Sequence, residues 1–402
     1  MKNKLLIYIF FVFCFTNIFS LSHSMNIYKY PDFNISREEC DNILESMNYP
    51  NPDYISEEPV TVYVDLLVEK IFEINGKEME FEAFYSMWHD WKEKRLTETL
   101  KKFNLFDDTG KRTYLCTYNP IELWGKANRL FYPTIEFYNK KTKTNVNLGG
   151  DADWVDIYSD GMVGTRLRDS AKFSANFDFR RFPFDTQVLS FELWSEFPST
   201  LVEIAPEPIS MPVYKETKFF FTDGDIQIPG WDLEKVDYYN YDYVDNDKLP
   251  YQGFYVDLTI KRQSSYYLFK IILPIIFILV ISWSVFWVRG SQLEAKVNVT
   301  IVCLLSLIAY NFIIDEDLPK LSYLTFLDSF ILLSYFYTGI ATILCVYSFV
   351  LKLKSGKDIS LLDLRARWIG PLSYFGVLFI LLIYFYNIEA VAGFFLGSKF
   401  TQ

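Results

Sequence analysis

The chain has 402 residues, half of them hydrophobic and 19% of them Phe, Tyr or Trp, so it is long enough for two or three domains. The formal net charge of −11 is unevenly placed: residues 1–265 carry 29 basic and 42 acidic side chains, and residues 266–402 carry ten and eight. The basic surface that nucleic acid requires is absent, so we expect no nucleic-acid partner. The acidic part would instead concentrate cations through its field.

The start of the chain has the three parts of a secretory signal. Lys2 and Lys4 form a basic beginning, an apolar run follows, and Ser20–Ser22 places small residues around a cleavage site. We therefore predict a signal peptide at residues 1–24 and an exported, ligand-binding domain at residues 25–265. An uncleaved anchor helix is the alternative.

The exported part contains many short runs in which β-branched and aromatic residues alternate with polar ones. Between the first two runs, Asn75-Gly76 is typical of a hairpin turn. Further strand-like runs are Leu130–Tyr138, Val155–Ile157, Met162–Leu167, Thr186–Trp194, Trp231–Val236 and Phe254–Arg262. Many short strands without an alternating helical pattern predict an all-β, immunoglobulin-like sandwich.

Cysteine and histidine are scarce in the exported part. Only Cys40 and Cys116 remain there once the signal is removed, so one disulfide is possible, although we favour two small buried thiols. The only histidines are His23 and His89, and no CxxC or HExxH spacing occurs. The exported part therefore contains almost none of the histidine and cysteine residues that a metal site, or a catalytic nucleophile with its base, would need. We therefore predict no metal, no cofactor and no enzymatic activity.

Four stretches are long and apolar enough to cross a bilayer as helices. They lie at about 266–288, 295–315, 321–351 and 367–396. The links after the first and third stretches carry mainly basic charges, which makes their side cytosolic. The sandwich then lies outside, in agreement with the signal peptide. We predict a transmembrane domain at residues 266–402 of a multi-pass protein in contact with lipid, in the cell (inner) membrane.

The second span is the most polar of the four, and lipid should not face so many polar groups. In a helix, one stripe of it is acidic at each end, polar near the start and apolar in the middle. The stripe contains Glu294, Asn298, Val302, Leu305, Ala309, Phe312 and Glu316. A charged ring that selects, a polar ring that coordinates and an apolar ring that gates by dewetting are typical of a pore. A core helix of a transporter or bundle is the alternative.

Three motifs resemble those of the pentameric ligand-gated ion channels, the Cys-loop receptor superfamily. Phe182-Pro183-Phe184-Asp185-Thr186-Gln187 is similar to the FPFD.Q signature of that family. The others are the stretch 265–287 that enters and crosses the first span, and Leu318-Pro319-Lys320 after the second. The resemblance covers roughly residues 58–395 and is closest to prokaryotic channels of the GLIC and ELIC type. Like those, the chain lacks the two cysteines of the loop, since Ala175 and Leu189 occupy their positions.

The resemblance implies a homopentamer whose central pore is lined by five copies of the stripe. Glu294 would form the ring at the cytosolic mouth, and five carboxylates would favour monovalent cations over anions. It also implies a coupling region between sandwich and membrane, with Arg262 paired to Asp185; a purely structural salt bridge is the alternative. The coupling residues would be Asn75, Gly76, Lys77, Phe182, Pro183, Phe184, Asp185, Arg262 and Pro319.

In this family the agonist site lies between neighbouring sandwiches, among aromatic loops. The matching positions are Glu136, Tyr138, Trp194, Glu196, Tyr238 and Tyr251. Rings beside carboxylates suit a small organic amine, although packing alone would also explain each ring. Protons acting on carboxylates with a raised pKa, and alkaline pH acting on Tyr or Lys, are the rival agonists. We predict a cation-selective ligand-gated channel, and keep a membrane-anchored receptor without a pore as the alternative outside the family.

Overall fold

The computed structural model describes residues 35–47, 58–107, 112–118, 130–143, 154–206, 228–245, 248–288, 292–314, 318–355 and 361–387. The predicted signal peptide lies outside these residues. The chain forms two compact units. The first contains Met1–Pro50, Lys92–Phe131 and Trp154–Gly164; the second contains Asn51–Trp91, Tyr132–Asp153 and Thr165–Gln402.

The first unit combines two short helices with a pair of antiparallel strands. These elements are α2 (Arg37–Ser46), α3 (Lys94–Lys102), β3 (Tyr114–Tyr118) and β6 (Trp154–Tyr158). Helix α2 begins with a capping box, in which the Ser36 hydroxyl accepts from the Glu39 amide and the Glu39 carboxylate accepts from the Ser36 amide. Helix α3 buries Leu96 and Leu100 completely, which explains why this short polar segment is helical.

Cys40 and Cys116 form a disulfide that joins α2 to β3, with their Cα atoms 6.2 Å apart. The expectation of two separate thiols is therefore wrong. Both residues are buried in the first unit, and 76 residues separate them in the sequence, so only the fold shows that they meet. A crosslink over so long a separation stabilises the folded state mainly by restricting the unfolded chain.

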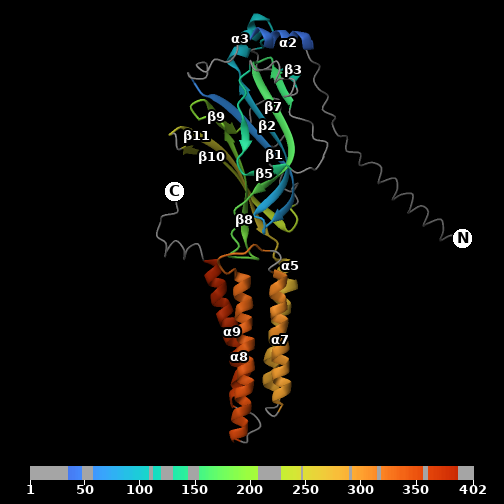
Figure 1. Cartoon of the computed structure of the whole chain (residues 1–402), viewed down its shortest axis with the longest axis vertical. Helices are drawn as coiled ribbons and strands as arrows, with labels where there is room; N and C mark the ends of the chain where they lie inside the picture. Colours follow the sequence, from blue (N-terminus) through green and yellow to red (C-terminus); the bar gives the residue numbers. More distant parts are fainter. Residues whose placement is uncertain are drawn as a thin grey trace, which may run out of the picture. The chain divides into compact units, whose positions relative to one another are not determined.

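The second unit contains a β-sandwich (Figure 1). Its first sheet is built from β1 (Val60–Asn75), β2 (Glu80–Lys92), β5 (Lys140–Lys143), β7 (Met162–Ser174) and β9 (Val202–Pro206). Its second sheet is built from β4 (Ile135–Phe137), β8 (Thr186–Ser195), β10 (Trp231–Val244) and β11 (Pro250–Arg262). The strand orders are β7-β2-β1-β9, with β5 on β7, and β10-β11-β8-β4.

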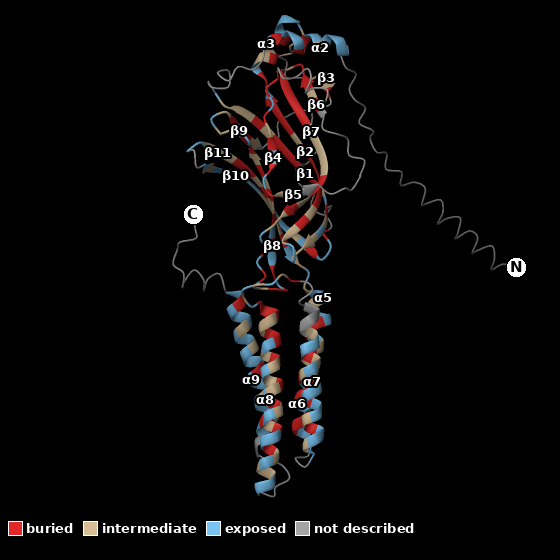
Figure 2. Cartoon of the chain, viewed as in Figure 1, coloured by how far each residue is buried: buried red, intermediate tan, exposed pale blue. Residues whose placement is uncertain are grey.

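Aromatic rings from both sheets fill the space between them. Phe81 and Phe173 of the first sheet lie 5.3 Å apart between ring centroids, and Phe173 lies 4.8 Å from Phe191 of the second. Along β8, buried side chains alternate with less buried ones, as expected for a strand with one face on a core. Figure 2 shows the buried residues along these strands. The predicted sandwich is therefore confirmed.

Strand β4 is shorter than the predicted run Leu130–Tyr138. Its ladder with β8 covers Ile135–Phe137. Pro133 explains the difference, because proline has no amide hydrogen to donate to a sheet ladder.

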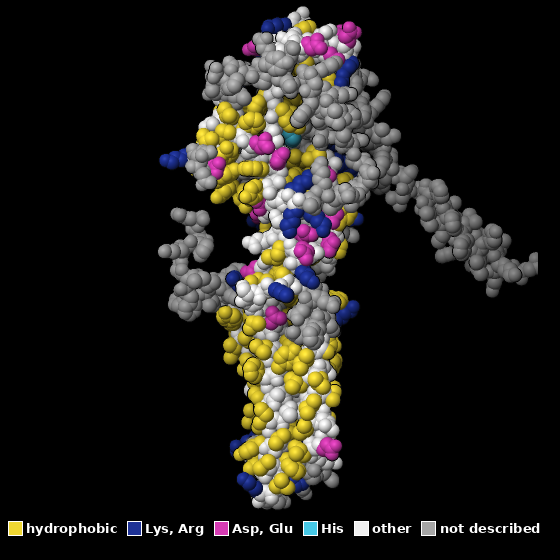
Figure 3. Space-filling model, in the orientation of Figure 1, with side chains coloured by type: hydrophobic (Ala, Val, Ile, Leu, Met, Phe, Trp, Pro, Cys, Tyr) yellow, Lys and Arg dark blue, Asp and Glu magenta, His cyan; other side chains and the backbone are white. Residues whose placement is uncertain are grey.

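Four helices follow the sandwich in the same unit and are long and apolar enough to span a membrane. The first is continuous from α5 (Ser265–Tyr267) through a π turn (Leu268–Ile272) and α6 (Leu273–Ser284) to a 3-10 turn (Val285–Trp287); the others are α7 (Leu293–Ile314), α8 (Phe326–Ser355) and α9 (Leu361–Tyr386). Hydrophobic side chains occupy much of the visible surface of these helices in Figure 3. The prediction of a sandwich followed by four apolar helices is confirmed.

The π turn in the first span has an identifiable cause. Pro274 lies two residues after its end, and a proline inside a helix cannot donate a hydrogen bond and clashes with the preceding turn. Widening the turn before the proline is one way in which a helix accommodates these constraints.

Candidate pore and coupling site

Helix α7 presents an exposed stripe along one side. Its described members are Glu294, Asn298, Val302, Leu305 and Ala309. Val302 and Leu305 are 61% and 60% exposed, whereas Thr300 and Leu307 on the other side are fully buried. The Tyr335 hydroxyl of α8 donates to the Leu307 carbonyl at 3.2 Å and fixes this orientation. The side chain of Phe312, and Glu316, lie outside the described residues.

A buried ion pair closes the base of the sandwich. The Arg262 guanidinium donates from Nε to Oδ1 of Asp185 at 2.7 Å and from Nη2 to Oδ2 at 3.0 Å. The two side chains are 13% and 1% exposed, and the guanidinium also lies 4.0 Å from the centroid of the Trp231 ring. Two parallel charge-assisted bonds with a cation–π contact give this pair one fixed geometry.

The loop that carries Asp185 is held by its own side chains. Gln187 donates through Nε2 to the Asp185 carboxylate at 2.6 Å and to the Asp178 carbonyl at 2.8 Å, and its Oε1 accepts from the Asp178 amide at 3.0 Å. The Phe182–Pro183 peptide bond in this loop is cis. The two hydrogen bonds donated by Gln187 hold the Asp185 carboxylate against the backbone of its own loop.

The same loop bonds to the membrane helices through its backbone and through Arg181. The Arg180 carbonyl accepts from the Phe326 amide at the start of α8 at 2.9 Å. The Arg181 guanidinium donates to the carbonyls of Phe385 at 3.1 Å and Tyr386 at 3.2 Å, at the end of α9. Sequence analysis missed these contacts; the only signal was the pair of arginines directly before the signature.

Aromatic contacts add to this attachment. The ring of Phe182 lies 4.7 Å from that of Tyr267 in α5, and Phe184 lies 5.6 Å from Phe326. The Phe179 amide donates to the Tyr323 hydroxyl at 3.1 Å. The loop thus contacts the first, third and fourth helices of the bundle.

A cavity of about 130 Å³ lies where three of the predicted coupling elements meet. It is lined by Ile74, Gly76, Phe177, Phe179, Gln187, Trp231, Arg262 and Tyr267. The structure therefore brings together the β1–β2 turn, the loop and the end of β11. Lys77 and Pro319 are described but do not line this cavity.

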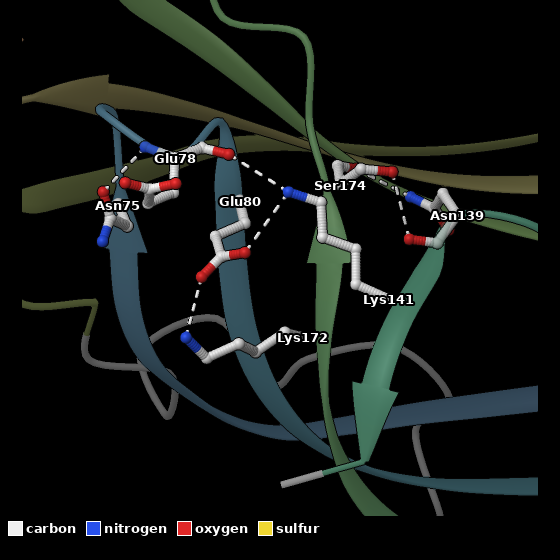
Figure 4. A network of polar contacts seen from close by, with 7 residues as sticks. All are labelled: Asn75, Glu78, Glu80, Asn139, Lys141, Lys172 and Ser174. Carbon is white, nitrogen blue, oxygen red and sulfur yellow. Dashed lines mark hydrogen bonds and ion pairs between the residues drawn. The ribbon is translucent and has the colours of Figure 1, made fainter. Parts of the chain in front are cut away.

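The β1–β2 turn is tied to β5 and β7 by a polar network, shown in Figure 4. Glu80 pairs with Lys172 at 2.7 Å and with Lys141 at 3.3 Å. Lys141 also donates to the Glu78 carbonyl at 3.1 Å, and the Glu78 amide donates to Asn75 at 3.0 Å. The hydrogen bond from Lys172 is the main cause that lowers the pKa of Glu80. The turn is thereby anchored to the rest of its sheet.

The outer face of the second sheet gathers most of the predicted ligand-binding residues. Trp194 stands opposite both Glu136 and Gly253 in the strand register, and its ring lies 5.5 Å from that of Tyr138. Tyr251 stacks on Tyr243 at 5.5 Å. Glu196 is exposed just beyond the end of β8.

Tyr238 lies on the other face of this sheet. It stands directly opposite Val256, which is fully buried in the core, and directly opposed residues project to the same side. Its place on the outer face is taken by residues that sequence analysis missed, namely Tyr239, Tyr241, Tyr243, Tyr255, Glu192 and Asp257. The spacing of Tyr239, Tyr241 and Tyr243 was the signal that could have found them, because every second residue of a strand lies on the same face. Which of the two faces they share with Tyr251 depends on the register of the two strands.

Ionisable groups on this outer face have shifted pKa values. Burial, and then the charge of Asp257, raise the pKa of Glu192. Burial, followed by Asp257, raises the pKa of Tyr239 to about 12, and its hydroxyl donates to Asp257 at 3.1 Å. By contrast, burial lowers the pKa of His89 to about 4. Burial thus shifts the two pKa values in opposite directions, upward for the Glu192 carboxyl and downward for the His89 imidazole.

A β-sandwich followed by four apolar helices, one of which has an exposed polar and apolar stripe, is the architecture of a membrane receptor of the channel type. The family described as "Neurotransmitter-gated ion-channel ligand binding domain" matches residues 36–264. The proton-gated ion channel of Gloeobacter violaceus (strain ATCC 29082 / PCC 7421) is 32% identical over 314 residues, which cover 76% of this chain and 77% of that protein.

Two animal proteins are also similar. The glutamate-gated chloride channel of Drosophila melanogaster is 27% identical over 274 residues, covering 67% of this chain and 54% of that protein. The gamma-aminobutyric acid receptor subunit beta-4 of Gallus gallus is 23% identical over 327 residues, covering 79% and 60%. The chain therefore belongs to the pentameric ligand-gated ion channels of the Cys-loop receptor family. These relatives are ion channels rather than enzymes.

Proposed function

We propose that the chain forms a homopentameric, cation-selective channel, opened by an agonist that binds the exported domain. The observation that carries this proposal is the exposed stripe of α7, which begins with Glu294 and Asn298. Lipid would penalise these two side chains, whereas a water-filled pore would not. Five subunits around an axis would cover the stripe and place five carboxylates in one ring.

The relatives include a chloride channel, so the sign of the permeant ion has to be argued from the residues of this chain. A ring of carboxylates attracts cations and repels anions, and Glu294 is exposed at the start of α7. In the proposed topology this end of α7 and the link between α8 and α9 face the cytosol, and the sandwich lies outside the cell (inner) membrane.

The first prediction concerns selectivity. In asymmetric NaCl, the reversal potential of the parent channel should follow the sodium gradient. Glu294→Ala should lower conductance and the ratio of sodium to chloride permeability, because it removes five charges from the narrow mouth. Patch-clamp recording of reconstituted protein measures both. Glu203→Ala, on β9 of the sandwich, is the control and should change neither. A parental reversal at the chloride potential would disprove cation selectivity.

For the agonist we propose a small organic amine bound on the outer face of the second sheet. Trp194, Tyr138 and Tyr251 present rings there, and Glu136 supplies a carboxylate beside Trp194. Aromatic faces attract a cation through their quadrupole, and a carboxylate neutralises its charge. The paired rings of Tyr243 and Tyr251 provide a flat wall for the methyl or ammonium groups of such a ligand.

The second prediction tests the amine. Each cation–π contact contributes about 0.5–2 kcal/mol, so Tyr251→Ala should raise the half-maximal amine concentration roughly 2- to 30-fold, whereas Tyr251→Phe should leave it nearly unchanged. Tyr63→Ala, in the first sheet, is the matched control. The measurement is a dose–response curve of current for a panel of primary amines.

Gating by protons is the second candidate function. It is supported by the raised pKa of Glu192 and by the similarity to a proton-gated channel. Gating by alkaline pH through this face is disfavoured, because the pKa of Tyr239 is raised to about 12. Two results together would show that the agonist is the proton rather than an amine. Tyr251→Phe and Tyr251→Ala would have equal effects, and acid would open the channel without any amine.

A further inference from the structure

A buried ion pair joins the pore helix to the fourth helix. Lys296 of α7 is 2% exposed, and so is Asp363 of α9. The Lys296 Nζ lies 3.2 Å from Oδ2 of Asp363. Neither residue belongs to the exposed stripe of α7 or to the coupling region at the sandwich base.

Apolar side chains lie close to the pair, and Arg367 donates to the Phe286 carbonyl of the same region at 3.1 Å. Buried Cys345 of α8 lies near both charges, within a cluster of buried side chains that also contains Val285, Phe286, Ala341 and Ala366. An isolated charge in such a place is strongly disfavoured, and a nearby opposite charge compensates for it. Asp363 is therefore the group that neutralises Lys296.

The position of Lys296 relative to Glu294 gives this pair its importance. Two residues along a helix correspond to a rise of about 3 Å and a rotation of about 200°. Lys296 therefore lies at nearly the same depth as Glu294, but on the opposite side of α7. Its positive charge would oppose the field of the Glu294 ring if no acid neutralised it.

Counting charges at this depth shows the consequence. With the pair intact, the three groups Glu294, Lys296 and Asp363 together carry one net negative charge per subunit, that of Glu294. Without the Asp363 carboxylate, the charge of a protonated Lys296 would offset that of Glu294 among these three groups. A residue on the fourth helix, outside the pore, can therefore set the field inside it.

We propose that Asp363 is a selectivity-determining residue, which neutralises Lys296 and so preserves the negative field of the Glu294 ring. The inference rests on the proposed cation-selective function. It differs from a purely structural role, in which the pair only fastens α9 to α7. A structural role predicts altered assembly without altered ion selectivity.

The experiment measures reversal potentials in asymmetric NaCl and the yield of pentamers for the parent and two variants. Asp363→Asn should reduce the ratio of sodium to chloride permeability on the order of tenfold, since five uncompensated charges act on the ion across roughly one Debye length. Lys296→Gln combined with Asp363→Asn removes both charges and should restore the parental ratio. If Asp363→Asn alone assembles poorly, mixed pentamers with parental subunits should show an intermediate ratio.

The outcomes separate the inference from the proposed function. A parent that reverses at the chloride potential disproves the proposed function itself. A cation-selective parent with an unchanged ratio in Asp363→Asn channels, pure or mixed, overturns the role of Asp363. The same holds if the double variant keeps the reduced ratio, because the loss would then come from altered packing rather than from charge.

Discussion

Asp185→Asn should uncouple the agonist from the pore. The variant leaves the buried Arg262 guanidinium without its carboxylate, which typically costs about 3–5 kcal/mol. Agonist-activated current should fall to a small fraction of the parental current, or need a far higher agonist concentration, while permeability ratios stay unchanged. Whole-cell current and the yield of pentamers by size-exclusion chromatography are the two measurements.

The pair permits a clean separation of coupling from folding. A coupling role predicts that pentamers form but open poorly, whereas a structural role predicts that few pentamers form. Asp178→Asn is the matched control, because Asp178 belongs to the same loop and its pair with Arg180 is exposed, so its loss should have little effect. Parental current and parental yield in Asp185→Asn would contradict both roles.

A double-mutant cycle with Arg262→Gln measures the coupling energy itself. If the two side chains act only through each other, the double variant should be no worse than the worse single variant. The loop explains why such a small change can matter. It bonds to α8 through the Arg180 carbonyl and to α9 through Arg181, so a change in its geometry would act on both helices.

Local patterns were sufficient for much of the architecture. The alternation in β8 and the apolar lengths of the spans predicted the sandwich and the four helices, because burial on one face or in lipid leaves a regular trace in the sequence. The pair between Asp185 and Arg262, expected from the signature loop, is present at 2.7 Å. Its role in gating stays a prediction.

Contacts between distant segments could not be predicted in the same way. Two examples are the disulfide of Cys40 with Cys116 and the ion pair of Lys296 with Asp363. Each joins segments that are far apart in the sequence, so no local pattern indicates the contact. The face occupied by Tyr238 depends on the register of β10 against β11, and a shift of one residue would have reversed it. Periodicity gives the faces of an element, but not which partner covers each face.

Leu305→Ser should make the channel open more easily. Leu305 is 60% exposed on the stripe of α7, between the polar start of the helix and Ala309, where five leucines would form a dry constriction. Dewetting of an apolar ring closes a pore, and a serine hydroxyl lowers the cost of filling it with water. Losing about 2 kcal/mol of apolar stabilisation in the closed state corresponds to a shift of tenfold or more in the gating equilibrium.

The measurement is the half-maximal agonist concentration, together with the current in the absence of agonist. In Leu305→Ser, the half-maximal agonist concentration should fall about tenfold or more, and the current without agonist should rise. Leu304→Ser is the matched control, since it makes the same chemical change about 100° round the helix, away from the stripe. An increase in the concentration required by Leu305→Ser, or an equal decrease in Leu304→Ser, would show that the apolar gate lies elsewhere, because only a side chain that faces the pore changes the hydration of the constriction.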